Sequence, residues 1–329
     1  YGTYETSING TTWVPVATGA GYTFSGLAPT SYTVQIRDAA HTGCVINLGT
    51  HTITQPVVLS ASVTSTMVTC HGAGNGTITV SNPAGGYGTY QTSIDGAQWF
   101  TVTTATPFVF SGLVPGTYTV QIRDAAHTGC VINLGTQTIT QPAILSASVA
   151  STMVTCYNAN NGTITVSNPT GGYGTYEVSL NGTNWFTVAT GAGYTFSNLA
   201  PASYPVSIRD MANPACVIGL GNQTITQPNI LSATVSATMV TCNGSADGTI
   251  TVSNPLGGYG TYETSINGTA WVSVATGGGY TFSGLAPASY TVQIRDAAYQ
   301  GCVINLGAIT ITQPVVLSAS VTSTPITCY

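Results

Sequence analysis

Eight cysteines are the residues of this chain best suited to covalent chemistry, and they recur every 86 residues, as from Cys44 to Cys130. They form two series. One series is Cys44, Cys130, Cys216 and Cys302, and the other is Cys70, Cys156, Cys242 and Cys328. An even, periodic set of cysteines is typical of a disulfide framework in an oxidising compartment. All eight are therefore disulfide candidates, and the sequence predicts an extracellular or cell-surface location.

Metal binding is the other chemistry open to such residues. Zinc sites use closely spaced cysteine and histidine pairs, but no Cys-x₂-Cys occurs, and His127 is replaced by Asn213 and Tyr299 in other copies. The Arg123-Asp124 pair recurs in every copy, and we expect the aspartate to cap a turn while the arginine lies over an outer face. Calcium bound by Asp124 at a domain junction is the alternative, although nine acidic residues supply few hard oxygen ligands. The sequence predicts no cofactor and no metal.

Catalytic patterns are missing from the sequence. Glu5, Glu177 and Glu263 recur, but Gln91 takes their place in one copy. Glycine-rich stretches such as 277–280 lie between expected strands, whereas phosphate-binding loops precede a helix. We found no paired carboxylates and no nucleophile with an adjacent base. The chain is therefore predicted not to be an enzyme.

Composition excludes further classes. Of 329 residues, 4% are charged, lysine is absent and the formal net charge is −5. A nucleic-acid partner needs many basic residues to neutralise phosphates, and four arginines are too few. No apolar run approaches the roughly 18 residues of a membrane-spanning helix. The sequence thus predicts neither a nucleic-acid partner nor a membrane span.

A repeat organises the chain. The segment YGTYETSING at Tyr1 returns in similar form at Tyr87, Tyr173 and Tyr259, and the tryptophans and arginines keep the same period. Gln-Pro pairs mark the boundaries, and the end copies are expected to be parts of a longer array. The predicted divisions are a partial repeat at 1–56, complete repeats at 57–142, 143–228 and 229–314, and the first strand of a further repeat at 315–329.

One copy predicts about seven short strands. In the repeat 57–142, alternation at 76–81 and 117–124 favours half-buried strands, and Asn, Gly and Pro clusters separate the segments. No helical period is present. The predicted fold class is all-β: tandem Ig-like antiparallel β-sandwich domains in a linear rod with an 86-residue period.

Two aromatic positions recur within this pattern. A tyrosine just after a proline-containing turn, at the start of the penultimate strand, predicts a tyrosine corner. These residues are Tyr32, Tyr118, Tyr204 and Tyr290. The four tryptophans are expected to be core aromatics, with exposed stacking on sugars as the alternative; they are Trp13, Trp99, Trp185 and Trp271.

Several motifs in order resemble a known family. They are Cys70-His-Gly-Ala-Gly-Asn-Gly-Thr-Ile-Thr-Val, Gly85-Gly86-Tyr, Phe110-Ser-Gly-Leu113, Pro115-Gly-Thr-Tyr-Thr-Val and Arg123-Asp124 followed by Gly129-Cys130. Together they resemble the SprB-type repeat of large cell-surface adhesins of gliding Bacteroidota, exported by type IX secretion. The resemblance implies an extracellular, Ig-like extender module. Near-identical, weakly charged copies favour a polymer-like fibre over a direct role in gliding.

Three cysteine pairings stay open. The resemblance implies a bond within one domain, Cys70 with Cys130, although a seven-residue strand at about 3.3 Å per residue would separate the two positions by more than ~20 Å. A hairpin pairing joins Cys44 with Cys70. A junction pairing joins Cys70 with Cys216 in the next repeat. Free or interchain thiols are the remaining possibility.

The predicted function is structural: an extender or filament segment of a secreted bacterial surface adhesin or extracellular fibre, built from stiff, disulfide-linked sandwiches. The short, apolar joints after Gln-Pro favour direct contact between neighbouring domains. Partners are expected to be neighbouring repeats or other copies of the chain. The alternative is a repetitive carbohydrate- or surface-binding module that acts by avidity.

Overall fold

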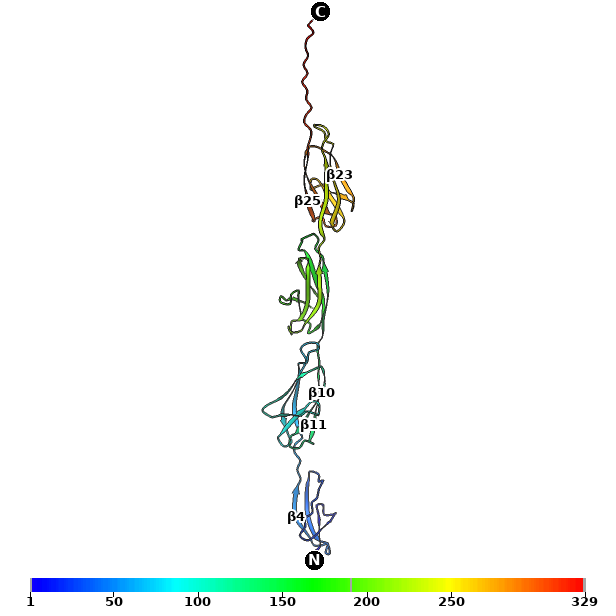
Figure 1. Ribbon diagram of the computed structural model, residues 1–329. Helices are drawn as coiled ribbons and strands as arrows, with labels where there is room; N and C mark the ends of the chain where they lie inside the picture. The colour runs from blue at the N-terminus through cyan, green and yellow to red at the C-terminus, as the bar shows by residue number, and fades with distance from the viewer. Residues whose placement is uncertain (1, 190, 328–329) are drawn as a thin grey trace. The chain divides into compact units, whose positions relative to one another are not determined.

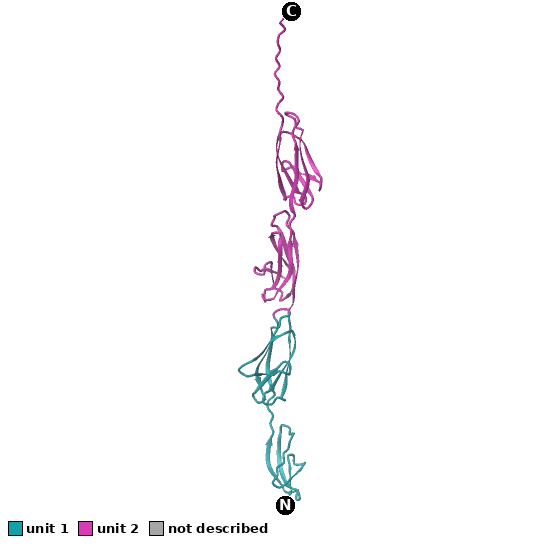
Figure 2. Cartoon of the chain, viewed as in Figure 1, with its two compact units in different colours: residues 1–68, 72–141 teal, residues 69–71, 142–329 magenta. Residues whose placement is uncertain are grey.

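The computed structural model describes residues 2–189 and 191–327 (Figure 1). These residues form strands and turns. They form no helix, and so no helix that could span a membrane is present among them. The chain divides into two compact units (Figure 2): unit 1 is Tyr1–Val68 with Gly72–Gln141, and unit 2 is Thr69–His71 with Pro142–Tyr329. The predicted all-β fold of tandem Ig-like antiparallel sandwiches is confirmed.

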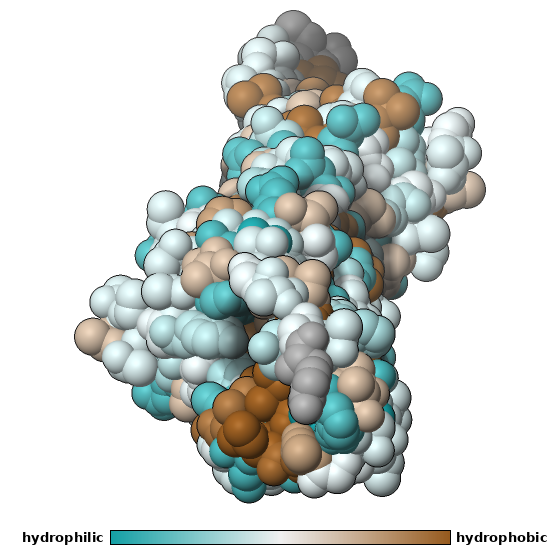
Figure 3. All heavy atoms as spheres, turned by 90° about the horizontal axis from the view of Figure 1, so that it is seen from below, coloured by the Kyte–Doolittle hydropathy of each residue, from teal (hydrophilic) through white to brown (hydrophobic). Residues whose placement is uncertain are grey.

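Unit 1 begins with a single four-stranded sheet in the order β2-β1-β3-β4. Its strands are β1 (Tyr4–Ser7), β2 (Val14–Val16), β3 (Ser31–Asp38) and β4 (Val45–Thr52). No second sheet covers it within residues 2–56, so Ile53 is 40% exposed whereas the equivalent Ile139 is 2% exposed. Figure 3 shows a hydrophobic patch on the side of the molecule that faces the viewer.

The first sandwich, also in unit 1, packs a three-stranded sheet (β5-β6-β9) on a four-stranded one (β11-β10-β7-β8). Every neighbouring pair within the sheets is antiparallel. The strands are β5 (Ser60–Thr66), β6 (Gly76–Ala84), β7 (Tyr90–Ser93), β8 (Phe100–Val102), β9 (Phe108–Leu113), β10 (Gly116–Asp124) and β11 (Val131–Ile139).

Unit 2 contains two sandwiches of the same topology, which we call the middle and the last sandwich. The middle sandwich comprises β12 (Ala143–Thr152), β13 (Gly162–Gly172), β14 (Tyr176–Ser179), β15 (Phe186–Val188), β16 (Gly193–Leu199), β17 (Ala202–Asp210) and β18 (Val217–Ile225). The last sandwich comprises β19 (Asn229–Thr238), β20 (Gly248–Gly258), β21 (Tyr262–Ser265), β22 (Val272–Val274), β23 (Gly279–Leu285), β24 (Ala288–Asp296) and β25 (Val303–Ile311).

Alternation along the strands builds each core. In β13, Ile164 and Val166 are fully buried between the sheets, while Thr163 and Thr165 lie on the outer face. Val206 and Ile208 of β17 pack against them from the facing sheet. A period of two therefore buries one apolar row from each layer, as the sequence predicts.

The tyrosine-corner residues make the hydrogen bond that this motif requires. Each hydroxyl donates to the backbone carbonyl four residues earlier, at the turn that leads into the penultimate strand. The bonds run from Tyr32 to Ala28 (3.1 Å), Tyr118 to Val114 (2.9 Å), Tyr204 to Ala200 (2.9 Å) and Tyr290 to Ala286 (2.9 Å). In the three sandwiches this contact fixes the chain as it crosses from the three-stranded sheet to the four-stranded sheet.

The expected first strand of a further repeat at 315–329 is not formed in the described residues 315–327. In the other repeats this strand pairs with the following Gly-Thr-Ile-Thr-Val segment, as β19 pairs with β20. Residues 315–327 pair with no other strand among the described residues, and a strand without a neighbour has no ladder to join.

Gly257, at the end of β20, allows the chain to pass close to the start of β19. Gly257 has a φ of +82°, and a Cβ added there would lie 2.0 Å from the Ile230 carbonyl oxygen. Gly260 also has a positive φ, +89°, but a Cβ there would meet nothing within 4 Å. A comparison of Gly257 with Gly260 therefore separates the cost of the backbone conformation, which both share, from the cost of the close approach, which only Gly257 has.

We expect Gly260→Ala to lower the free energy of unfolding of the last sandwich by about 1–2 kcal/mol, the typical penalty of a left-handed alanine. Gly257→Ala should lower it by about 3 kcal/mol or more, because the contact with Ile230 adds to that penalty. Hydrogen exchange in peptides from β19 and β20 would measure both. Equal effects of the two substitutions would show that close approach does not constrain Gly257.

Candidate functional site

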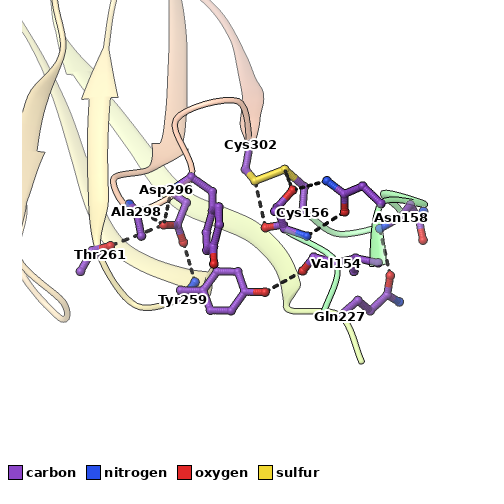
Figure 4. The surroundings of a disulfide bond; sticks show 12 residues. Val154, Cys156, Asn158, Gln227, Tyr259, Thr261, Asp296, Ala298 and Cys302 are labelled. Carbon is purple, nitrogen blue, oxygen red and sulfur yellow. Dashed lines mark hydrogen bonds between the residues drawn. A yellow bond between two sulfur atoms is a disulfide. The ribbon is translucent and has the colours of Figure 1, made fainter. Parts of the chain in front are cut away.

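Two covalent links connect the middle and last sandwiches within unit 2. The first is the peptide segment 226–228, between the end of β18 and the start of β19. The second is the disulfide between Cys156 and Cys302, whose Cα atoms lie 5.4 Å apart (Figure 4). We call this pair of links the joint.

The sandwich that carries Cys156 also holds it in place. The Val154 N–H, just after β12, donates to the Thr226 carbonyl at 3.2 Å, which ties the exit of the first strand to the exit of the last. Beyond the cysteine, the Asn158 N–H donates to the Gln227 side-chain oxygen at 2.9 Å (Figure 4). The disulfide and the peptide segment therefore leave the middle sandwich side by side.

A tight loop at the end of β24 positions Cys302. The Asp296 carboxylate is fully buried and accepts N–H groups of Tyr259 and of Ala298 (2.9 Å), as well as the Thr261 hydroxyl (3.5 Å). The Cys302 N–H closes the loop on the Tyr299 carbonyl at 2.8 Å. The carboxylate thus organises the loop through backbone amides, as the sequence predicts for the aspartate of the Arg-Asp pair.

Tyr259 adds a noncovalent contact across the joint. Its hydroxyl donates to the Val154 carbonyl at 2.6 Å (Figure 4). Its ring centroid lies 4.7 Å from that of Tyr299. Partial burial raises the pKa of Tyr259, with smaller contributions from Tyr299 and the Asp296 charge. The hydroxyl therefore stays protonated at neutral pH and remains a donor to the middle sandwich.

The disulfide itself is part of a packed surface. Cys302 is 8% exposed, and Cys156 packs against the cluster of the last sandwich that contains Leu231 and Ile294. A cleft of ≈ 250 Å³ lies beside it, lined by both cysteines, Tyr157, Pro228 and Asn229 among others. Contact between Cys156 and the last sandwich therefore adds to the covalent bonds of the joint.

The loop around Asp296 offers no set of ligands for a calcium ion. N–H and hydroxyl donors point at both Asp296 oxygens, and a cation would have to displace them. Among the described residues, no group of three or more His, Cys, Asp and Glu side chains could hold a metal ion. No side-chain nitrogen or oxygen buried in the described ranges lacks a hydrogen-bond partner.

A second disulfide joins Cys70 and Cys216, both of which belong to unit 2. It pairs the same two repeat positions as Cys156 with Cys302, and its Cα–Cα distance is again 5.4 Å. Of the three pairings that the sequence left open, the structure therefore has the junction pairing. Among the described cysteines, Cys44, Cys130 and Cys242 are unbonded and exposed, and Cys328 lies outside the described residues.

The other two pairings, Cys70 with Cys130 and Cys44 with Cys70, are wrong, because Cys70 is bonded to Cys216 and both Cys44 and Cys130 are unbonded. The Val68 N–H donates to the Thr140 carbonyl at 3.1 Å, so the first and last strands of that sandwich end at the same place. Cys70 follows that end of β5, whereas Cys130 precedes β11 and lies one strand length away. Nine residues at about 3.3 Å span ~30 Å, far beyond the reach of a disulfide.

The prediction that the four tryptophans are core aromatics is wrong. Trp13, Trp99, Trp185 and Trp271 are half-buried on the outer face of the four-stranded sheets, and none belongs to a core cluster. An arginine guanidinium lies 4.2–4.3 Å from each ring centroid. A cross-strand acceptor holds the arginine in turn, as Glu177 holds Arg209 at 2.7 Å. Cation–π stacking therefore covers the tryptophan.

Sequence reasoning missed the glutamine before each boundary proline and the cross-joint tyrosine. Gln227 and the equivalent Gln313 both accept an N–H from the loop after the first-strand cysteine, at 2.9 and 3.0 Å. The repeated Gln-Pro pair is a signal for that contact, although we used it only to place boundaries. For Tyr259 no signal exists, because its acceptor is a backbone carbonyl of another sandwich.

The buried aspartate offers a test with an internal control. In Asp296→Asn, the amide NH₂ would face one of the backbone N–H donors, so we expect a loss of about 1–3 kcal/mol in the unfolding free energy of the last sandwich. Asp95→Asn should leave the first sandwich unchanged, because asparagine makes the same contacts at the equivalent Asn181 and Asn267. Urea unfolding followed by hydrogen exchange would measure both; an equal loss in both variants would contradict this account.

Asp124 is the equivalent aspartate of the first sandwich, and its pKa implies that the stability of this sandwich depends on pH. Burial acts to raise the pKa of Asp124, but N–H donors of Tyr87 and Ala126 and the Thr89 hydroxyl outweigh it, so the pKa lies below the usual 3.8. A carboxyl whose pKa is lower in the folded state stabilises the fold above its unfolded pKa and loses that contribution as the pH falls through the folded value.

We therefore expect the first sandwich to lose stability below about pH 4, and Asp124→Asn to flatten that dependence. Hydrogen exchange of β6 and β10 from about pH 6 down to pH 2 would measure both proteins. Parallel loss of stability in the two proteins would contradict a role for Asp124.

Comparison with known proteins bears on this geometry. No curated protein matches the chain. A solved structure, the three N-terminal domains of the Highly Immunogenic Outer Capsid protein (Hoc) of bacteriophage RB49, is similar at 11% identity, covers 79% of this chain and 99% of that one, and has a TM-score of 0.32. No conclusion follows from a likeness at that score. Residues 148–184, which run from β12 past β14 and include Cys156, match the model of the SprB repeat, and this confirms the predicted resemblance.

Proposed function

We propose that this chain is an extender segment of a large secreted bacterial surface adhesin or extracellular fibre. The match to the SprB repeat supports a repeat region of a surface adhesin, and the disulfides support a location outside the cell. The proposal includes export by type IX secretion from a gliding member of the Bacteroidota, and this part rests on the family resemblance. The chain acts without enzymatic chemistry.

One observation carries the extender role: the joint has two covalent attachments. A single peptide link allows two domains to swing and to twist about it. At the joint, residues 226–228 include Pro228, and Cys156–Cys302 fixes a second point. Tyr259 and the contact of Cys156 with the last sandwich restrict motion about the axis through those two points.

The carbohydrate-binding alternative has weaker support in the geometry. It requires aromatic rings with an open face on which a sugar can stack. Arg209 covers one face of Trp185, and the indole N–H donates to the Gly182 carbonyl at 3.1 Å. These contacts favour a structural use of the tryptophan. Neighbouring repeats, and other copies of the chain, are the partners that we propose.

Small-angle scattering of the whole oxidised chain would test the extender role. We expect a maximum dimension on the order of 150 Å, from about 35–40 Å per sandwich. The paired variant Cys156→Ser/Cys302→Ser should keep its sandwiches but show a broader distribution of distances, because one link of the joint is lost. A compact particle, or a wild-type chain as flexible as the variant, would contradict the proposal. Binding of the oxidised chain to a glycan array would favour the alternative.

A further inference from the structure

The two disulfides interleave along the chain. We call Cys70–Cys216 the first staple and Cys156–Cys302 the second staple; each joins cysteines 146 residues apart. The order of the four cysteines is 70, 156, 216, 302, so each staple opens before the other closes. Three chain segments therefore run between the same two staples: 70 to 156, 156 to 216, and 216 to 302.

Each of the three segments contains the core of a different sandwich. The segment from Cys70 to Cys156 holds β6–β11 of the first sandwich, and the segment from Cys156 to Cys216 holds β13–β17 of the middle one. The segment from Cys216 to Cys302 holds β19–β24 of the last sandwich. Along an unstapled chain these cores would lie in series, and pulling would open the weakest one first.

We propose that the interleaved staples place the three complete sandwiches in parallel under tension. The two staples can move apart only if all three segments lengthen, so the first, middle and last cores must open together. The proposal deepens the extender function, because a spacer that holds a surface at a distance has to resist pulling. Covalent connectivity and the assignment of strands to segments carry the proposal.

The folded middle sandwich shows how tension crosses it without shearing its sheets. β12 continues to Cys156 and through the second staple to the last sandwich, and β18 begins next to Cys216 of the first staple and continues through 226–228. Both strands are already extended, so each transmits tension along its own backbone. The β13–β17 core lies between them, and its ladder hydrogen bonds are not loaded until the flanking segments lengthen.

The connectivity predicts three distinct lengths between Cys70 and Cys302. Without staples the path has 232 residues (302 − 70); with either staple alone it has 86, and with both it has 60 (216 − 156). At about 3.5 Å per residue, these paths extend to ~800, ~300 and ~210 Å. Both single-staple chains share one length, because the repeat makes the two outer segments equal.

Force spectroscopy of the full chain, held at both ends, would measure these lengths. Four versions of the chain are needed, and in all four Cys44, Cys130, Cys242 and Cys328 are changed to serine. The version with no further change keeps both staples and is called the wild type here. The other three carry Cys70→Ser, Cys156→Ser or both. We expect Cys70→Ser and Cys156→Ser to extend ~90 Å further than the wild type, and the double variant ~600 Å further. Steps of one sandwich should appear in the variants and be missing from the oxidised wild type.

Reduction supplies a version of the test without substitution of the four stapled cysteines. Dithiothreitol reduces each disulfide to two thiols and is itself oxidised, so the reduced wild type should reach the length of the double variant. Single-sandwich steps in the oxidised wild type, or equal lengths for wild type and single variants, would overturn the parallel arrangement. A flexible chain in solution scattering would overturn the extender role and leave these lengths unchanged.

Discussion

The first and last strands of each sandwich end at the same place, and the joint depends on this constraint. A backbone hydrogen bond marks it three times: Val68 to Thr140, Val154 to Thr226 and Val240 to Thr312. The cysteine that follows the first strand is thereby brought beside the peptide that leaves the last strand. The cysteine that precedes the last strand is one strand length away, at the opposite end. A disulfide within one sandwich is therefore out of reach, and one between successive sandwiches is within reach.

Charge is scarce in this chain and is used to fix geometry. Arg209 lies between Glu177 and Trp185, so its charge orders a patch of the outer sheet face. Asp296 is buried and surrounded by N–H and hydroxyl donors, and the loop that it organises carries Cys302. A buried carboxylate with several donors is a rigid anchor, because loss of any one partner leaves an unsatisfied polar group. The few charges thus place the tryptophan cover and the disulfide loop.

Local patterns in the sequence predicted the features that depend on one copy. Strand alternation predicted the buried row that includes Val120 and Ile122, and a tyrosine just after a proline-containing turn predicted the corner at Tyr204. Trp185 was placed wrongly, because its partner Arg209 lies on another strand and covers the ring on the outer face of the sheet. The cysteine pairing stayed open for a related reason: it depends on how two copies meet, and no spacing within one copy encodes that.

Differences between copies separate what the joint requires from what it tolerates. Tyr259 meets Tyr299 at 4.7 Å, whereas the equivalent Tyr87 stacks on His127 at 4.0 Å, and the middle sandwich has Asn213 at that position. The staple, by contrast, uses the same two positions both times, with the same Cα separation. Aromatic packing at this loop therefore adjusts to whatever residue is present. The covalent link cannot adjust in this way, because a disulfide tolerates little change in the distance between its two backbones. The cysteine loop and the buried aspartate beneath it are consequently the parts of the repeat whose geometry must be kept, whereas the residue that faces the tyrosine varies between copies.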